Sequence, residues 1–345
     1  MEYKDSRESQ QSYFLAGSFV LALRLVVGWT YFSAFWRRLV LADKLDPDTA
    51  GYIGEKFNHF LPNALGIKPM IEYLVSNPDI LWWAMVAFTL IEALVGLLVM
   101  LGLFTRLMGV GVLALATGIL LGSGWLGTTC LDEWQIGILG MATGFALLLT
   151  GGGRYSLDYR WLGRTFVGKW KLYPWVASGT LPVKEKVLNK FVLGGSVAIL
   201  FVTLLTNQYF HGGVWGELHN KSVSPIVEIS DARLTAKELH FTVFRSEGVD
   251  VYGSFLIGIE LKDASGNSIF AYGGEELAHF PKSHILNRYV AKVKPGKHSL
   301  VIPLGAKAEL IVPSSELADL KNGEYKLILT DISGLEWEKT IRVGQ

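Results

Sequence analysis

The chain has 345 residues, of which half are hydrophobic, and its formal net charge is +1. A net charge so close to zero argues against a nucleic-acid-binding protein. The single cysteine, Cys130, excludes an intrachain disulfide and any cysteine-rich metal or iron–sulfur site. The length allows two or three domains.

Five apolar stretches are long enough to cross a bilayer, and each must be helical because backbone polar groups in lipid have to be satisfied internally. A polar stretch without a small-residue cleavage site precedes the first of them, which we therefore interpret as a retained membrane helix. Glycine recurs through the next three, which suits close contact between helices in a bundle. The five stretches are residues 14–36, 81–103, 108–125, 134–150 and 190–207.

Lys and Arg in the loops predict the orientation of these helices. The segment between the fourth and fifth stretches is rich in both and should be cytoplasmic, whereas the turn at residues 123–134 has neither and should face outward. The N-terminus is then inside, and everything after the fifth helix is outside. The protein would be integral to the cytoplasmic membrane.

The region after residue 208 changes character. Segments such as ELHFTVF, AELIVP and EYKLILTDI alternate apolar and polar residues, and turn signals such as DASGN and KNGE separate them. Seven or eight short strands of this kind predict an immunoglobulin-like antiparallel sandwich. The predicted fold class is a four-helix transmembrane bundle, then a fifth transmembrane helix carrying an extracytoplasmic all-β sandwich. The predicted domains are a membrane bundle at 1–160, a basic cytoplasmic connector at 161–189, the fifth helix at 190–208 and the sandwich at 209–345.

The first four helices resemble the DoxD/DoxX membrane family, on the segments RLVVGWTYFSAFWRR, IEALVGLLVMLGLFTR and GGGRYSLD. The region that follows looks like the DoxA partner fused to DoxD. The resemblance implies the small subunits of thiosulfate:quinone oxidoreductase, which oxidise two thiosulfates to tetrathionate with quinone as acceptor. The implied partners are thiosulfate, a membrane quinone and the lipid bilayer, with a second copy of the chain or a terminal oxidase left open.

Glu92 is the single ionisable residue in the apolar run at 81–103, roughly 16 Å along the helix from its start. Arg24 offers an opposite charge at similar depth in the first stretch. A buried pair of this kind can simply fix helix register. Alternatively, it relays protons to a quinone, because ionisable residues within membranes are functional candidates by default.

Arg37 and Arg38 close the first helix on the predicted outer side, where their planar donor groups could hold thiosulfate or anchor lipid headgroups. Cys130 is either an ordinary small residue or a thiolate that carries a thiosulfate as a mixed S-thiosulfonate, although Asp132 beside it disfavours a thiolate. The tryptophans of the outer half are an interfacial belt or a stacking wall for a quinone ring. The candidate residues are therefore Arg24, Glu92 and Cys130 for catalysis, Arg37, Arg38, Asp132 and Trp134 for thiosulfate, and Trp29, Trp36 and Trp82 for the quinone.

No flavin, haem or metal motif is visible, so the quinone enters as a co-substrate and the sulfane sulfur of thiosulfate attacks either the quinone or an oxidised Cys130. A competing interpretation is a non-catalytic membrane scaffold or accessory subunit that recruits another redox protein. A transporter is disfavoured because the helices show no inverted repeat.

Overall fold

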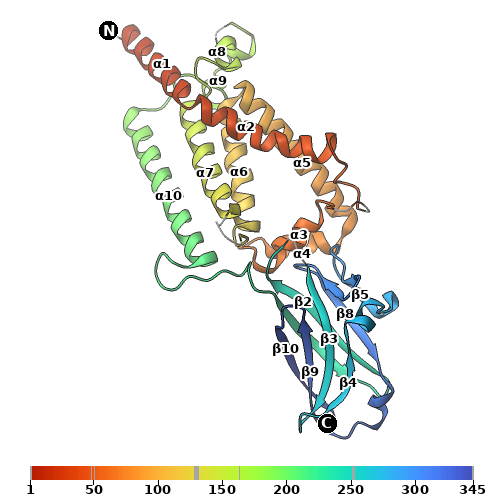
Figure 1. The fold of residues 1–345 in the computed structure, drawn as a ribbon. Helices are drawn as coiled ribbons and strands as arrows, with labels where there is room; N and C mark the ends of the chain where they lie inside the picture. Colours follow the sequence, from red (N-terminus) through yellow and green to blue (C-terminus); the bar gives the residue numbers. More distant parts are fainter. Residues whose placement is uncertain are drawn as a thin grey trace. The chain divides into compact units, whose positions relative to one another are not determined.

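The computed structural model describes residues 2–47, 49, 51–127, 132–162, 164–250 and 253–343 (Figure 1). The chain divides into two compact units, and neither unit is a single continuous segment. The first unit is helical and the second is built mainly of strands. The helical unit comprises Met1–Ile53, Trp82–Gly124 and Leu131–His219, and the second unit comprises Gly54–Leu81, Trp125–Cys130 and Asn220–Gln345.

The helical unit contains the long apolar helices. Among the described residues, four segments are long and apolar enough to cross a membrane, and they lie within α5, α6, α7 and α10. The helices at the start of the chain bend by 53° at a break, and Glu8–Phe19 with Leu21–Val40 makes a fifth span only if the bent pair is counted as one. The four later predicted spans thus correspond to described helices, and the first stays a prediction. The helices are α1 (Glu2–Phe19), α2 (Leu21–Phe35), α5 (Pro78–Leu101), α6 (Thr105–Ser123), α7 (Asp132–Thr150) and α10 (Glu185–His211), and the shorter elements are η1 (Trp36–Val40), α8 (Leu157–Trp161), η3 (Val167–Lys169) and α9 (Tyr173–Val176).

Glycines allow two pairs of these helices to touch at their backbones. A Cβ on Gly96 of α5 would lie 2.5 Å from the backbone nitrogen of Phe32 in α2. A Cβ on Gly144 of α7 would lie 2.6 Å from the backbone nitrogen of Leu113 in α6, and Figure 1 shows α6 and α7 running side by side. Small residues at helix crossings are the usual means of close packing in lipid.

The strands of the second unit form two sheets in which every assigned pairing between strands is antiparallel. The first sheet has the order β1-β2-β8-β5, and the second has the order β10-β9-β3-β7-β6, with β4 paired to β3. This confirms the predicted all-β region, while its immunoglobulin-like type stays a prediction. The strands are β1 (Ile226–Leu234), β2 (Glu238–Glu247), β3 (Ser254–Asp263), β4 (Ser268–Tyr272), β5 (Ile285–Asn287), β6 (Lys294–Pro295), β7 (Leu300–Ile302), β8 (Lys307–Pro313), β9 (Gly323–Asp331) and β10 (Glu336–Val343).

The core of this unit consists of alternate side chains along the strands. Leu239, Phe241 and Val243 of β2 are fully buried, as are Leu327 and Leu329 of β9. This is the period-two pattern of a sheet that is covered on one face. Burial of these apolar side chains is the main source of stability for the fold of the unit.

Two short helices from between α2 and α5 also belong to the second unit. They are α3 (Glu55–Phe60) and α4 (Lys68–Ser76). Asn58 of α3 is fully buried; its side chain donates to the carbonyl of Gly305 at 3.0 Å and accepts from the backbone nitrogen of Ala291 at 3.1 Å. A segment that precedes α5 in the sequence is therefore part of the packing of the β-rich unit.

Gly305 is the residue at which this packing is least tolerant of change. Its φ is +72°, and a Cβ there would lie 1.8 Å from the carbonyl oxygen of Asn58. We expect Gly305→Ala to lower the free energy of unfolding by on the order of 3 kcal/mol, from left-handed backbone strain and overpacking together. The measurement is thermal unfolding of the purified chain in detergent. Gly323→Ala is the control, because nothing lies within 4 Å of its Cβ position, and equal shifts for the two variants would contradict the account.

Candidate functional site

Glu92 forms a buried ion pair inside the helical unit. It lies on α5 and is 3% exposed, and its carboxylate accepts a hydrogen bond from the guanidinium of Arg38. The side chain of Arg38 is 19% exposed, against 5% for that of Glu92. A carboxylate at this depth in an apolar helix is costly unless it is paired. The Glu92 side chain of the pair is therefore buried, whereas the Arg38 side chain is partly exposed.

Arg38 reaches Glu92 from a local irregularity of its helix. Residues Trp36–Val40 form the π-helical turn η1, in which the backbone nitrogen of Leu41 donates to the carbonyl of Trp36 at 3.0 Å. A π turn adds one residue to the helical repeat, and such turns are frequent at functional sites. The adjacent Arg37 has a different partner. Its side chain is exposed, and its Nε donates to the carbonyl of Ser33 at 3.3 Å. The two arginines that the sequence places together therefore have separate partners.

Two further polar side chains lie on the same helices as the ion pair. Thr89 is 1% exposed and precedes Glu92 by three residues, so the two share one face of α5. Its hydroxyl has no hydrogen-bond partner among the described residues. Tyr31 of α2 is also buried, and its hydroxyl lies 3.3 Å from the position that a Cβ on Gly140 would take. The unpartnered hydroxyl of Thr89 is a free donor one helical turn from a buried carboxylate.

Arg24 is not the partner of Glu92, which corrects the pairing suggested by sequence depth. Arg24 is 1% exposed and donates to the carbonyls of Gly152 and, at 2.6 Å, Tyr155. Its guanidinium lies 2.8 Å from the Cβ position of Gly102, which is ten residues, or about 15 Å, beyond Glu92 along the chain.

The reason lies in the bend and in the helix register. Because α2 begins at Leu21, Arg24 is in its first turn and not halfway along a straight span. Gly28 of α2 contacts Gly96 and Met100 of α5, which fixes an antiparallel register. That register places Arg24 beside the C-terminal end of α5. Arg38, at the far end of the helical segment that begins with α2, lies beside Glu92.

A second buried polar network ties together the opposite end of the helical unit. Asp158 is fully buried. Its carboxylate accepts hydrogen bonds from the backbone nitrogens of Phe104 and Thr105 and from the hydroxyls of Thr105 and Ser178, at 2.7–3.0 Å. Burial raises the pKa of Asp158, and these donors act in the opposite direction. Arg106 is also fully buried, and its guanidinium donates to carbonyls of the α7 end and of the connector. Those carbonyls belong to Leu148, Leu149, Pro174 and Gly179.

Among the described residues, Asp158 and Arg106 each have several partners within the chain, so the network holds the helix ends together. The two charges of the network stand in the TRLM and GGGRYSLD segments, within a few residues of glycines at 102, 109 and 151–153. Gly102, Gly151 and Gly153 have positive φ values of 62–68°, which bring the backbone into reach of these side chains. From hydropathy alone, Arg106 and Asp158 would be interpreted only as loop residues.

The remaining predicted site residues are dispersed over the helical unit. The Trp82 indole donates to the carbonyl of Leu45, and the Trp134 indole donates to the hydroxyl of Thr206 in α10, each at 3.0 Å. Trp29 and Trp36 are 54% and 42% exposed. Of the predicted tryptophans, Trp36 is the nearest in sequence to Arg38, because both belong to the same π turn. Cys130 lies outside the described residues, and Asp132 begins α7 with a side chain that is also outside them.

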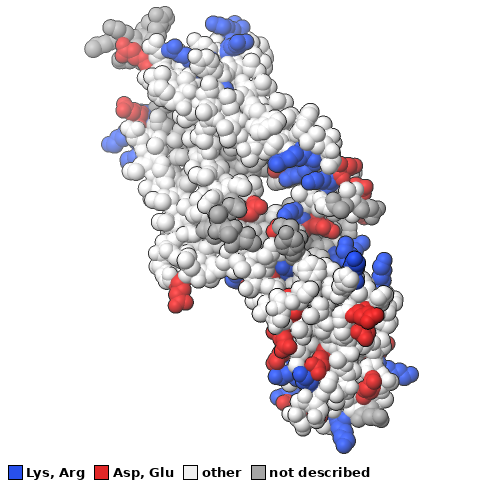
Figure 2. Space-filling model, viewed as in Figure 1, with Lys and Arg blue, Asp and Glu red and all other residues white. Residues whose placement is uncertain are grey.

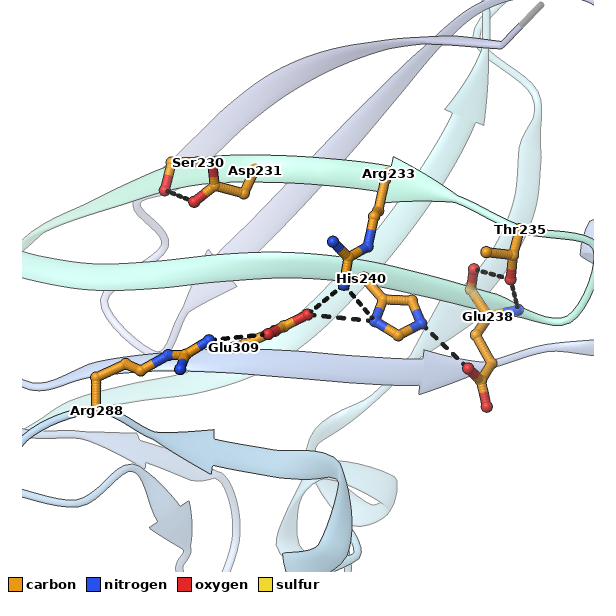
Figure 3. Close-up of polar contacts among 8 residues, drawn as sticks. All are labelled: Ser230, Asp231, Arg233, Thr235, Glu238, His240, Arg288 and Glu309. Carbon is orange, nitrogen blue, oxygen red and sulfur yellow. Dashed lines mark hydrogen bonds and ion pairs between the residues drawn. The ribbon is translucent and has the colours of Figure 1, made fainter.

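A network of charged side chains lies on the first sheet of the second unit (Figure 3). Glu309 of β8 binds Arg233 at 2.7 Å and Arg288 at 3.3 Å, and His240 of β2 lies 3.4 Å from Glu309 and 3.1 Å from Glu238. Cross-strand pairs of this kind stabilise a sheet modestly. Among the residues that the structure describes, no group of three His, Cys, Asp or Glu side chains is arranged to hold a metal ion.

Comparison with known families covers most of the chain. Residues 19–183 match the family model described as TQO small subunit DoxD, and residues 210–340 match the one described as TQO small subunit DoxA. The DoxD match contains the Glu92–Arg38 pair, Thr89, Tyr31 and the network around Asp158. The DoxA match contains the two sheets, apart from the last residues of β10.

Proposed function

Since the chain belongs to the DoxD and DoxA families of thiosulfate:quinone oxidoreductase (TQO) small subunits, joined in one polypeptide, we propose that it oxidises thiosulfate and reduces a membrane quinone. Two thiosulfate ions lose one electron each and join through a new sulfur–sulfur bond as tetrathionate. The quinone takes up the two electrons together with two protons and leaves as quinol. The observation that supports a site for the second half-reaction is the buried Glu92–Arg38 pair in an apolar helix.

The geometry of the pair suits a quinone carbonyl that enters from the Arg38 side. The Arg38 side chain is partly exposed, and its guanidinium can donate to a carbonyl oxygen and stabilise negative charge there as electrons arrive. Thr89 supplies a further donor that the chain leaves unused. Glu92, once protonated, passes on one of the two protons that the reduced quinone requires, since a buried carboxyl is a suitable general acid. Trp36 in the same π turn would stack on the ring.

The thiosulfate half-reaction is proposed to take place at the outer face, with the N-terminus inside and the β-rich unit outside. Arg37 is exposed and offers a guanidinium to the oxyanion end of thiosulfate. Two routes follow from the residues. In the first, the sulfane sulfur of one thiosulfate attacks the quinone, and a second thiosulfate displaces the adduct as tetrathionate and quinol. In the second, the quinone takes two electrons as the Cys130 thiolate and one thiosulfate join in an S-thiosulfonate, from which a second thiosulfate releases tetrathionate and the free thiolate. Cys130→Ala separates them, because unaltered turnover leaves only the direct route.

The test of the proposed function is a reconstituted assay with the purified full chain, thiosulfate and a short-chain quinone. We expect loss of quinone absorbance that depends on thiosulfate, with one tetrathionate formed per quinone reduced. The second candidate is a non-catalytic accessory subunit, which is favoured by the small-subunit descriptions of both matches. Absence of turnover until a further redox protein is added would support that role and overturn the first.

A further inference from the structure

A surface pocket lies between α1 and the segment that follows α7. Its volume is about 420 Å³, and its polar lining comes from Arg154, Arg164, Gln10 and Gln11. An adjoining pocket of about 470 Å³ shares Arg154 and Gln11 and adds Ser12 and Glu8. Both are separate from the Glu92–Arg38 pair, which is at the other end of α2.

The two arginines of the first pocket have no neutralising partner. Among the described residues, neither guanidinium is in a hydrogen bond or an ion pair, whereas Arg24, Arg38 and Arg106 each have partners inside the chain. Both side chains are exposed, so the cost of leaving them unpaired is small in water. Two guanidinium groups beside two amide donors form a site for an oxyanion, because their planar donor groups match phosphate oxygens.

The rest of the lining is apolar and points to a ligand with a hydrocarbon part. Phe14 and Tyr159 form a wall, with their rings edge to face at 4.7 Å, and Leu162 continues it. Large aromatic side chains near the pocket in sequence are exposed, which is typical of residues at the depth of lipid headgroups. They are Tyr155, Phe166, Trp170 and Trp175, at 72%, 81%, 49% and 48% exposure.

A long stretch of the sequence at this end of the helical unit carries charge of one sign only, which is positive. Between Asp158, which is buried, and Glu185 the chain has no acidic residue but several Lys and Arg. Figure 2 shows Lys and Arg side chains over the part of the helical unit that carries α8 in Figure 1, with Asp and Glu side chains beside them where Figure 1 has α1, while the middle of the helices is almost uncharged. An anionic surface lipid complements such a face.

We propose that the pocket binds the headgroup of an anionic phospholipid. Arg154 and Arg164 contact the phosphate oxygens, the glutamine amides donate to the glycerol ester region, and an acyl chain lies along Leu162. The lipid bridges α1 and the segment after α7, so it also fixes α1 against the rest of the helical unit.

The test uses the delipidated full chain in neutral detergent and native mass spectrometry with added phosphatidylglycerol. We expect saturable binding of one lipid, and the double variant Arg154→Gln/Arg164→Gln should bind it roughly thirty-fold more weakly. The matched control is Arg160→Gln/Lys171→Gln, which removes the same charge from exposed positions that do not line the pocket and should leave the affinity within about twofold.

Three outcomes would overturn the proposal. Equal weakening by the control variant would mean attraction to diffuse surface charge, and equal binding of phosphatidylcholine would mean that the headgroup charge is not recognised. The third is competition by inorganic phosphate at concentrations comparable to the lipid, which would make the pocket a site for a soluble anion.

Discussion

Glu92→Gln should lower the rate of quinone reduction by about a hundredfold or more while the protein stays folded. Glutamine keeps the size of the side chain and can still accept a hydrogen bond from Arg38, but it cannot carry a proton. Loss of a positioned general acid costs 10²–10⁴ in rate. The measurement is steady-state quinone reduction with saturating thiosulfate, with thermal unfolding of the same preparation to show that the fold is retained.

Two further variants sharpen this result. Glu185→Gln removes an exposed carboxylate at the start of α10 and should leave the rate unchanged. Glu92→Asp keeps a titratable group at a shorter reach and should recover part of the activity. A Glu92→Gln protein with near-normal turnover would remove Glu92 from the mechanism and leave the ion pair a determinant of helix register.

Arg106→Met should destabilise the helical unit by on the order of 3–5 kcal/mol. Methionine keeps the length of the apolar stem, but the four carbonyl oxygens that the guanidinium satisfies would lose their donor in a buried site. Removing one member of a buried charged network leaves Asp158 with less compensation as well. Unfolding in detergent, followed by tryptophan fluorescence, measures the loss.

Arg160→Met is the matched control for this prediction, since Arg160 lies two residues from Asp158 on α8 but is exposed. Its effect should stay within about 0.5 kcal/mol. Similar losses for the two variants would show that the polar network at the helix ends does not stabilise the unit in the way described.

The long elements could be predicted from sequence because their signals are local. Hydropathy places a span at 81–103 and the structure has α5 at Pro78–Leu101, while the next predicted span, 108–125, corresponds to α6 at Thr105–Ser123. The turn at Gly102, whose φ is positive, ends α5 two residues before the predicted end. The period-two segments after residue 208 likewise became strands, because alternation along a strand depends only on which face is buried.

The partners of buried charges could not be predicted, because they depend on helix register. Depth along an assumed straight helix pairs Glu92 with Arg24, but the break before Leu21 and the Gly28–Gly96 contact move Arg24 to the other end of α5. The π turn that directs Arg38 to Glu92 has no signal in composition or periodicity.

The packing between segments far apart in the sequence could not be predicted either. The helices α3 and α4 lie between two predicted spans, and nothing in their own sequence shows that Asn58 meets backbone groups of Ala291 and Gly305. Such contacts join segments more than 200 residues apart and are fixed by the folded sheets.

Mapping where the quinone binds tests directly whether the Glu92–Arg38 pair is part of its site. A short-chain quinone with a photoreactive azide would be crosslinked to the purified chain, and labelled peptides would be identified by mass spectrometry. We expect adducts on residues 31–40 and 85–96, around Arg38 and Glu92, that excess unlabelled quinone suppresses. Suppressible adducts confined to α10 or to the β-rich unit would contradict it.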